Sequence, residues 1–303
     1  MPTRFDPVRL RTVHVVPVTA MTDDSRLALD EQCRLTADLV QAGASVLLPA
    51  AGTGEFQSLS ADEILDVVRV TKATAGPDVL VFTPVGGPIG QALQLARRSV
   101  EIGADGVMFM PFPHPYLNDV GVTEYYRAVL AATPLPALIY KTAPIPSDRL
   151  LLELSELPQV VGVKYAVNEL PVFAETVRQG RDRCEWLCGS AERFAPYYML
   201  AGATGYTSGA ANLCPRLSLS MHRALAQGDM ATAPQRQRMI LPIEHYRARN
   251  GDSYGISLLK FGLSLRGFAV GPPRPPQRQL TAAEQAEIEE LLRPILVAES
   301  QLV

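Results

Sequence analysis

Short apolar runs alternate with longer amphipathic stretches over roughly the first 228 residues of the chain. The runs are rich in β-branched residues and too short for helices, which is typical of strands buried on both faces. We expect eight strands, at Val13–Val18, Ser45–Pro49, Val79–Phe82, Gly106–Met110, Ala137–Tyr140, a run within Pro158–Val167 that ends at Lys164, Glu185–Cys188 and Thr204–Ser208.

The stretches between the strands carry helix signals. A helical pattern from Leu29 to Gln41 stops at a glycine, and Ser60-Ala-Asp-Glu63 is a capping box that opens a helix through Ala75. Strands that alternate with helices predict a parallel sheet, and eight units predict a closed (β/α)8 barrel. An open doubly wound sheet is the alternative, although no G-x-G-x-x-G follows the first strand, which counts against a dinucleotide-binding form.

The last quarter of the chain has no strand pattern. We expect helices at Ala231–Arg249, Ser253–Leu265 and Thr281–Ala298, the last opened by a second capping box, Thr281-Ala-Ala-Glu284. They are joined by the proline-rich link Gly271–Pro276, which is expected to be extended because proline disfavours helix. The chain therefore divides into a barrel at residues 1–228 and a helical extension at 229–303. Helices outside a barrel pack on it or on a partner subunit, so we expect a homo-oligomer.

Composition narrows the class of protein. The chain has 303 residues, 47% of them apolar and 19% charged, as in globular proteins. A net charge of -3 gives no reason to expect nucleic acid or an anionic membrane as partner. The N-terminus lacks an apolar signal region, and no apolar run reaches membrane-spanning length, so we predict a cytoplasmic protein.

A metal site is not predicted, because the cysteines lack metal-ligand spacing and the histidines are isolated. These residues are Cys33, Cys184, Cys188, Cys214, His14, His114, His222 and His245.

The strand that ends at Lys164 carries the first chemical signal. Burial at the end of a core strand penalises the ammonium form, so the pKa of this lysine should fall. A lysine of lowered pKa attacks carbonyl groups and forms Schiff bases. The alternative is a lysine whose ammonium group reaches water beside the strand.

Other candidates follow from the barrel, whose active sites lie at the C-terminal ends of the strands. Tyr140 ends the strand before that of Lys164, and its hydroxyl could move the protons that Schiff-base formation needs, or simply face water. The Gly52-Thr53-Gly54 loop exposes backbone N–H groups suited to a substrate carboxylate, or is a plain tight turn. For Glu55 we expect a role in holding loop backbone groups.

Together these residues resemble the lysine Schiff-base family of dihydrodipicolinate synthase and N-acetylneuraminate lyase, over essentially the whole chain. The resemblance is carried by Pro17-Val-Thr19, Ala51-Gly-Thr-Gly-Glu-Phe56, Gly103-Ala-Asp-Gly106, Ile139-Tyr140 and Val161-Gly-Val-Lys164. Within the family the chain is most similar to the 5-dehydro-4-deoxyglucarate dehydratase branch. That similarity is carried by Gly52 in place of a threonine, the Pro115-Tyr-Leu117 loop and the run Leu265–Arg274.

The resemblance implies roles for individual residues. Lys164 matches the Schiff-base lysine and Tyr140 the proton-relaying tyrosine. Gly52 and Thr53 match the loop that holds the carboxylate of a 2-keto acid. The segment Gly205–Asn212 matches the family's site lining after the eighth strand, through Thr207, Ser208 and Asn212.

The chain departs from the dehydratases directly after the tyrosine. They carry Asn-Arg there, and this chain has Lys141-Thr142. An arginine would pair with a substrate's far carboxylate, which Thr142 cannot do. Either Lys141 compensates as a point charge or the substrate lacks that carboxylate. The synthases' arginine beyond the tyrosine is replaced by Ile145, and the loop tyrosine that a neighbouring subunit lends has only Tyr116 and His114 as candidates.

The resemblance implies a lyase that needs no metal or organic cofactor and acts on a 2-keto acid derived from a sugar acid. Dehydration of a 5-dehydro-4-deoxyglucarate-like substrate, with or without decarboxylation, is the first expectation. A pyruvate-dependent aldolase or synthase is the alternative. A third hypothesis is a barrel that binds a keto acid but does not catalyse a reaction. The Lys141-Thr142 departure favours it, and the presence of both Lys164 and Tyr140 argues against it. The family also favours a tetramer or a dimer of dimers.

Overall fold

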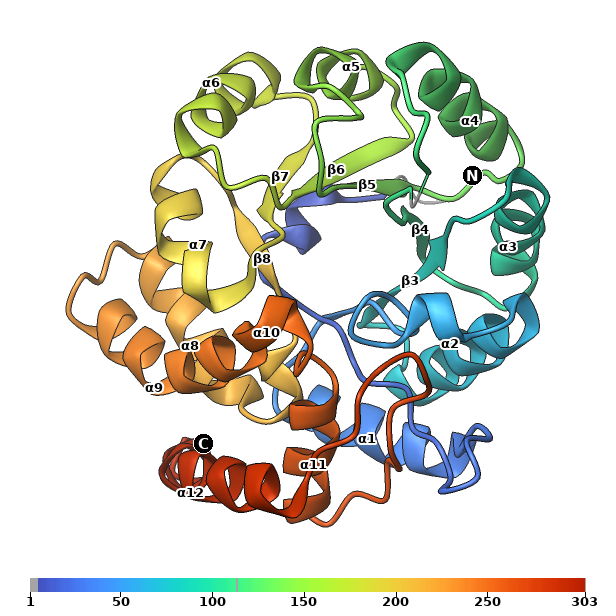
Figure 1. Cartoon of the computed structure of the whole chain (residues 1–303). Helices are drawn as coiled ribbons and strands as arrows, with labels where there is room; N and C mark the ends of the chain where they lie inside the picture. The colour runs from blue at the N-terminus through green and yellow to red at the C-terminus, as the bar shows by residue number, and fades with distance from the viewer. Residues whose placement is uncertain (1–4, 113, 303) are drawn as a thin grey trace.

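Eight parallel strands close into a barrel in the computed structural model, which describes residues 5–112 and 114–302 (Figure 1). Each strand pairs with the next, and β8 pairs with β1, His14 lying opposite Thr207. The predicted (β/α)8 barrel is therefore confirmed. The strands are β1 Val13–Val15, β2 Val46–Leu47, β3 Leu80–Val85, β4 Gly106–Phe109, β5 Ala137–Lys141, β6 Val160–Tyr165, β7 Glu185–Cys188 and β8 Gly205–Ser208.

A ring of helices covers the barrel, with one helix after each strand (Figure 1). The predicted capping boxes are both present: Ser60 with Glu63 opens α2, and Thr281 with Glu284 opens α12. The ring consists of α1 Leu29–Gln41, α2 Ala61–Ala75, α3 Ile89–Glu101, α4 Asp119–Ala131, α5 Asp148–Leu154, α6 Leu170–Gly180, α7 Ala191–Leu200 and α8 Pro215–Ala226, with short 3-10 turns η2 Phe56–Ser58 and η3 Ala210–Asn212 in two of the loops.

The N-terminal end of the barrel is closed by the 3-10 turn η1, Pro7–Leu10. Leu10 is fully buried there, and a Cβ added to Gly162 of β6 would lie 3.6 Å from its side chain. With this end filled, the C-terminal end of the strands is left for a site, as in other barrels of this architecture.

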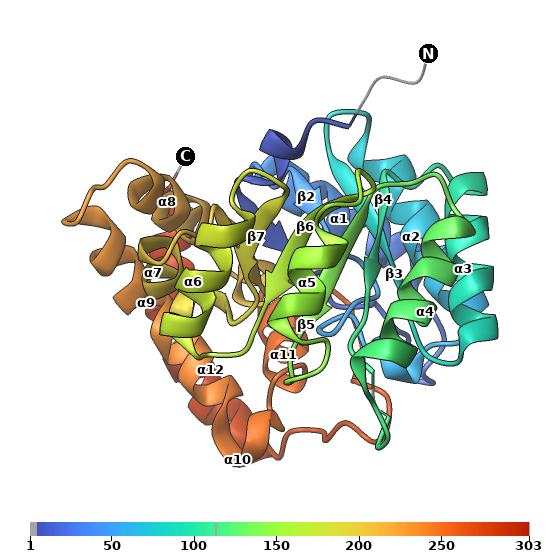
Figure 2. The same cartoon turned by 90° about the horizontal axis from the view of Figure 1, so that it is seen from above.

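The extension contains α9 Thr232–Arg247, α10 Arg249–Asp252, α11 Ser257–Leu265 and α12 Ala282–Ser300. The first predicted helix ends two residues early, at Arg247, and the chain then kinks within α10, where Asn250 and Gly251 adopt left-handed backbone angles. α9 packs against α7 and α8 of the ring. Figure 2 shows α10 and the link before α12 at the end of the barrel opposite the N-terminus.

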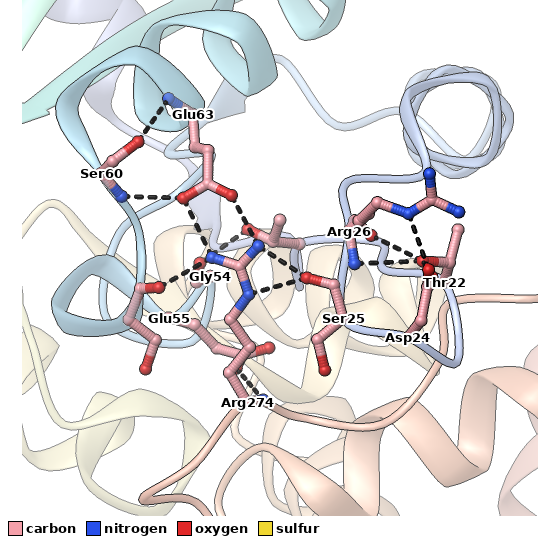
Figure 3. Close-up of polar contacts among 11 residues, drawn as sticks. Thr22, Asp24, Ser25, Arg26, Gly54, Glu55, Ser60, Glu63 and Arg274 are labelled. Carbon is pink, nitrogen blue, oxygen red and sulfur yellow. Dashed lines mark hydrogen bonds and ion pairs between the residues drawn. The ribbon is translucent and has the colours of Figure 1, made fainter.

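The link that follows α11 is fastened to the barrel by Arg274. Its guanidinium donates to both carboxylate oxygens of Glu63 at the start of α2 and to the carbonyls of Ser25 and Ser58 (Figure 3). Bidentate pairs of this kind fix geometry as well as adding energy. The proline-rich link is therefore held against the loops that follow β1 and β2. The expectation that it is extended throughout is wrong, because Gly271 adopts a positive φ and the chain turns at Pro275–Pro276, where the Gln277 N–H donates to the Arg274 carbonyl.

A second connection is buried. The Nζ of Lys260 in α11 lies 2.6 Å from Oε1 of Glu55, with the two side chains 2% and 0% exposed. The backbone N–H of Arg274 donates to the other Glu55 oxygen at 2.8 Å. Glu55 thus joins the loop after β2 to the extension. The expectation that it holds backbone groups of its own loop is wrong, because its carboxylate instead contacts Lys260 and the Arg274 N–H.

Removing the Lys260 charge tests this connection. Lys260→Met leaves the Glu55 carboxylate buried without its cation, which costs about 3–5 kcal/mol for pairs of this kind. The free energy of unfolding, measured by chemical denaturation, should fall by that amount. Arg69→Met is the control, because the Arg69–Asp66 pair at 2.9 Å is about half exposed and should contribute about 1 kcal/mol or less. Equal losses in the two variants would contradict the buried-pair account.

Candidate active site

Lys164 and Tyr140 lie side by side at the C-terminal ends of β6 and β5. They are register partners in the two paired strands, so their side chains point to the same face of the sheet. The Lys164 Nζ lies 3.8 Å from the centre of the Tyr140 ring. The structure therefore brings the two predicted catalytic side chains into contact.

The surroundings of Lys164 disfavour its charged form. Its side chain is buried, and its Nζ has no hydrogen-bond acceptor or carboxylate partner among residues 5–112 and 114–302. Desolvation lowers the pKa of Lys164 to about 7. Burial likewise raises the pKa of Tyr140 to about 12, so its hydroxyl keeps its proton at neutral pH. The pair thus offers an amine that is largely free to attack a carbonyl and a phenol that can donate a proton.

A glycine makes room for the lysine. Gly189 follows β7, and a Cβ placed on it would lie 3.1 Å from the Lys164 Cγ and 2.8 Å from the Ala166 Cβ. Contacts this short force side chains to shift, so any larger residue here would displace the lysine stem.

The loop after β2 is rigid where it faces the barrel mouth. Thr19 donates from its Oγ1 to the carbonyl of Gly54 at 2.6 Å, and Glu55 is anchored to the extension. Ala50 and Glu55 both adopt positive φ, which non-glycine residues rarely do. A Cβ on Gly54 would approach the Ala50 backbone to 2.7 Å, so this turn requires glycine. Gly52 and Thr53, in the middle of the loop, are held in a fixed position.

A cavity of about 530 Å³ connects these parts. Its lining includes Gly52, Thr53, Tyr140, Lys164 and Thr207, five of the residues expected from the sequence. The structure therefore brings the amine, the phenol and the loop expected to bind a carboxylate around one space that is large enough for a small keto acid.

Three other expected residues do not line this cavity. The Lys141 ammonium donates to the carbonyls of Pro144 and Pro146 in the loop after β5. Ser208 donates to Glu192. Asn212 accepts from the Val18 N–H and donates to the Val16 carbonyl, both in the loop after β1. Successive residues in a strand face opposite sides, which explains why Tyr140 and Thr207 enter the cavity while Lys141 and Ser208 do not. The idea that Lys141 supplies a point charge to the substrate has no support in this placement.

Some of the residues that line the cavity come from the extension, and the strand ends did not predict them. The lining includes Glu244, Arg247, Ala248, Asp252 and Gly255, from the end of α9 through the turn before α11. Asn168, in the loop before α6, and Arg193, in the first turn of α7, were also missed. A helix that follows the last barrel unit gives no local signal that its end will lie over the site.

His114 and Tyr116 lie elsewhere. They line a separate, mainly apolar hollow between the starts of α3 and α4, together with Phe112 and Leu117, and the Tyr116 side chain is largely exposed. Across residues 5–112 and 114–302 no cluster of three His, Cys, Asp or Glu side chains is arranged to hold a metal ion. No helix in that part of the chain is long and apolar enough to cross a membrane.

Known proteins are similar to this chain over most of its length. A model of the dihydrodipicolinate synthetase family matches residues 9–295. A probable 5-dehydro-4-deoxyglucarate dehydratase of Bacillus subtilis is 33% identical over 263 residues, which cover 84% of each protein. A protein of the same name from Rhodococcus opacus is 32% identical over 92% of this chain and 93% of the relative.

Solved structures agree in fold. A dihydrodipicolinate synthase from Bacillus clausii superposes with a TM-score of 0.91 and 32% identity, over 95% of this chain and 98% of that one. A sialic acid aldolase from Ruminococcus gnavus superposes with a TM-score of 0.89 over 97% of this chain and all of the other, at 20% identity. Because the identity to the aldolase is only 20%, that comparison supports the fold alone.

The lowered pKa of Lys164 can be measured directly, because the chain has only four lysines. After reductive ¹³C-dimethylation, the NMR resonance of Lys164 should titrate with a midpoint near pH 7, since burial removes the water that would stabilise the ammonium ion. The α-amino group also titrates near neutrality, so the Lys164 resonance is assigned by its disappearance in Lys164→Arg. Titration of every lysine above about pH 9, near the ordinary value, would show that the site does not perturb this amine.

Proposed function

Because the chain belongs to the dihydrodipicolinate synthetase family, we propose that it is a lysine-dependent lyase of a 2-keto acid, and specifically a dehydratase of a 5-dehydro-4-deoxyglucarate-like sugar acid. The observation that carries this proposal is the contact between Lys164 and Tyr140 at the mouth of a cavity that also includes Gly52 and Thr53. The proposed chemistry needs no metal and no organic cofactor.

The first step is formation of an imine. The neutral Lys164 amine adds to the C2 ketone, and the Tyr140 hydroxyl gives the proton with which the former ketone oxygen leaves as water. The product is a protonated imine, whose positive charge makes the neighbouring C3 proton acidic. Backbone N–H groups of the Gly52-Thr53 loop hold the C1 carboxylate during these steps.

The second step uses the imine as an electron sink. The Tyr140 phenolate left by the first step takes the C3 proton, which gives an enamine. The enamine electron pair expels the C4 hydroxyl, and Tyr140 returns the proton, so that the hydroxyl leaves as water. Hydrolysis of the remaining imine returns Lys164 as the free amine. Decarboxylation of the dehydrated product is a compatible later step. The names of the relatives from Bacillus subtilis and Rhodococcus opacus support dehydration as the outcome.

A second outcome has its own support. The Bacillus clausii structure, at 32% identity, is of a dihydrodipicolinate synthase. A pyruvate-dependent synthase or aldolase would use the same enamine to form or break a C–C bond, and would differ only in the group that occupies the outer part of the cavity. A homo-oligomer, either tetramer or dimer of dimers, and a cytoplasmic location remain part of the proposal.

Borohydride trapping tests the imine. With pyruvate or a 2-keto-3-deoxy sugar acid, reduction should add the keto acid to Lys164, located by mass spectrometry of the digested protein. Since only the neutral amine attacks, initial trapping should become faster as the pH rises through about 7. Lys260→Arg is the control, because it keeps a cation beside Glu55 and leaves the cavity lysine in place.

An adduct on another lysine, or none with any keto acid, would rule out the Schiff-base proposal. Where the adduct forms, the products separate the two outcomes. Release of water without a three-carbon fragment supports the dehydratase, whereas pyruvate and an aldehyde support the aldolase.

Tyr140→Phe tests the proton relay. This change keeps the ring under the Lys164 amine but removes the hydroxyl, so kcat should fall by roughly 10²–10⁴-fold, the usual contribution of general acid–base catalysis. The pKa of Lys164, measured by NMR, should change little, because its burial is preserved. A kcat within about threefold of the wild type would exclude Tyr140 from proton transfer.

A further inference from the structure

The cavity needs a cation if its substrate carries a second carboxylate, and strand β5 does not provide one. Thr142 lines the cavity, but Lys141 is turned away toward the loop after β5. Among residues 5–112 and 114–302, the basic side chains of the lining are Lys164, Arg193 and Arg247. Since Lys164 is the amine of the proposed chemistry, a second anion would have to bind one of the two arginines.

The guanidinium of Arg247 is fixed at the end of α9. Its Nε donates to the carbonyl of Gly255 at 2.9 Å, and its Nη1 donates to Oε1 of Glu244 at 2.6 Å. The Arg247 side chain is only 16% exposed. Its Nη2 has no hydrogen-bond partner within the part of the chain that the structure describes. The planar group is therefore held in one orientation, with donor capacity left over.

The end of β8 is shaped around this guanidinium. Gly209 follows the strand directly and lines the cavity beside Thr207. A Cβ added to Gly209 would lie 2.6 Å from Nη2 and 2.8 Å from Nη1 of Arg247. Only glycine leaves space for the group there, so the barrel and the extension form this position together.

Arg193 differs from Arg247 both in its exposure and in its hydrogen bonds. Its side chain is exposed and lies over the Phe194 ring at 5.1 Å. No carboxylate or backbone carbonyl of the described chain accepts a hydrogen bond from it at the cavity. It provides an exposed surface charge, whereas Arg247 is a preorganised donor.

We propose that Arg247 is the specificity-determining residue that binds a second carboxylate, at the far end of the 2-keto acid, with Glu244 as the residue that positions its guanidinium. The inference rests on the proposed function and names its substrate class: 2-keto acids with a carboxylate at both ends. Arg247, supplied by the extension, takes the place of the arginine that this chain lacks after Tyr140. Glu244 already neutralises part of its charge, so the selectivity comes from orientation and a free donor edge as well as from net charge.

Two substrates that differ only at the far end test this. A 2-keto-3-deoxy aldarate ends in a carboxylate, and the matching 2-keto-3-deoxy aldonate ends in a hydroxymethyl group. The wild-type enzyme should prefer the first by kcat/KM. Arg247→Gln should lower kcat/KM for the aldarate by roughly 10- to 100-fold and change that for the aldonate by about threefold or less, because a charge-assisted contact is lost for one substrate alone. Borohydride trapping of pyruvate on Lys164 should be unchanged.

Further variants guard against a merely structural effect. Gly209→Ala should reduce the preference for the aldarate by displacing the guanidinium without removing it. Arg193→Gln also removes one positive charge from the cavity lining, but it should keep the preference for the aldarate. Arg247→Lys should recover only part of it, because lysine keeps the charge but loses the planar fork.

Any of three results overturns the inference: the wild type does not prefer the aldarate, Arg247→Gln lowers kcat/KM for both substrates alike, or Arg193→Gln removes the preference. Failure of the proposed function is a separate result, namely no pyruvate adduct on Lys164 of the wild type. In that case, calorimetric binding of both acids to Lys164→Ala, with and without Arg247→Gln, still decides the role of Arg247. Loss of aldarate binding in the double variant supports the role, and equal binding overturns it.

Discussion

A buried amine with no carboxylate partner among the described residues is the constraint on which the site depends. Lys141, Lys164 and Lys260 are all buried, and desolvation is the largest effect on the pKa of each, lowering it. Their partners differ. Lys260 lies against the Glu55 carboxylate and Lys141 near Asp148, whereas Lys164 faces the ring of Tyr140. Among these three lysines, only Lys164 has its desolvation almost unopposed, because Cys188 alone acts to raise its pKa. Three similar side chains therefore have different chemistry.

The extension is as important to the site as the barrel. Glu55 is held by α11 and the link, and through it the Gly52-Thr53 loop is held at the barrel mouth. Arg247 reaches the cavity from α9 over Gly209. The barrel and the extension can be described separately, with a division between residues 228 and 229, but the cavity is formed by both. Changes in the extension should alter substrate binding even though the reacting amine belongs to a barrel strand.

The sequence predicted much of this arrangement because barrel strands have strong local patterns. The closed barrel, both capping boxes and the family were expected and are confirmed. The lyase class is confirmed with the family. Lys164, Tyr140 and Thr207 meet at one cavity because strand ends of a barrel meet at one face. Lys141 and Ser208 were included although the two-residue period of a strand directs them outward, so stricter use of that period would have excluded them. Arg247 could not be found from local pattern, because its place depends on how a helix docks far along the chain.

The central claim is that Lys164 forms a covalent bond to a keto acid whose carboxylate lies on the Gly52-Thr53 loop. A crystal structure of the protein soaked with pyruvate tests both parts at once. The account predicts continuous electron density from the Lys164 Nζ to C2 of the pyruvate, with the carboxylate accepting hydrogen bonds from backbone N–H groups of that loop. Pyruvate bound without a bond to Lys164, or with its carboxylate away from Gly52 and Thr53, would contradict it.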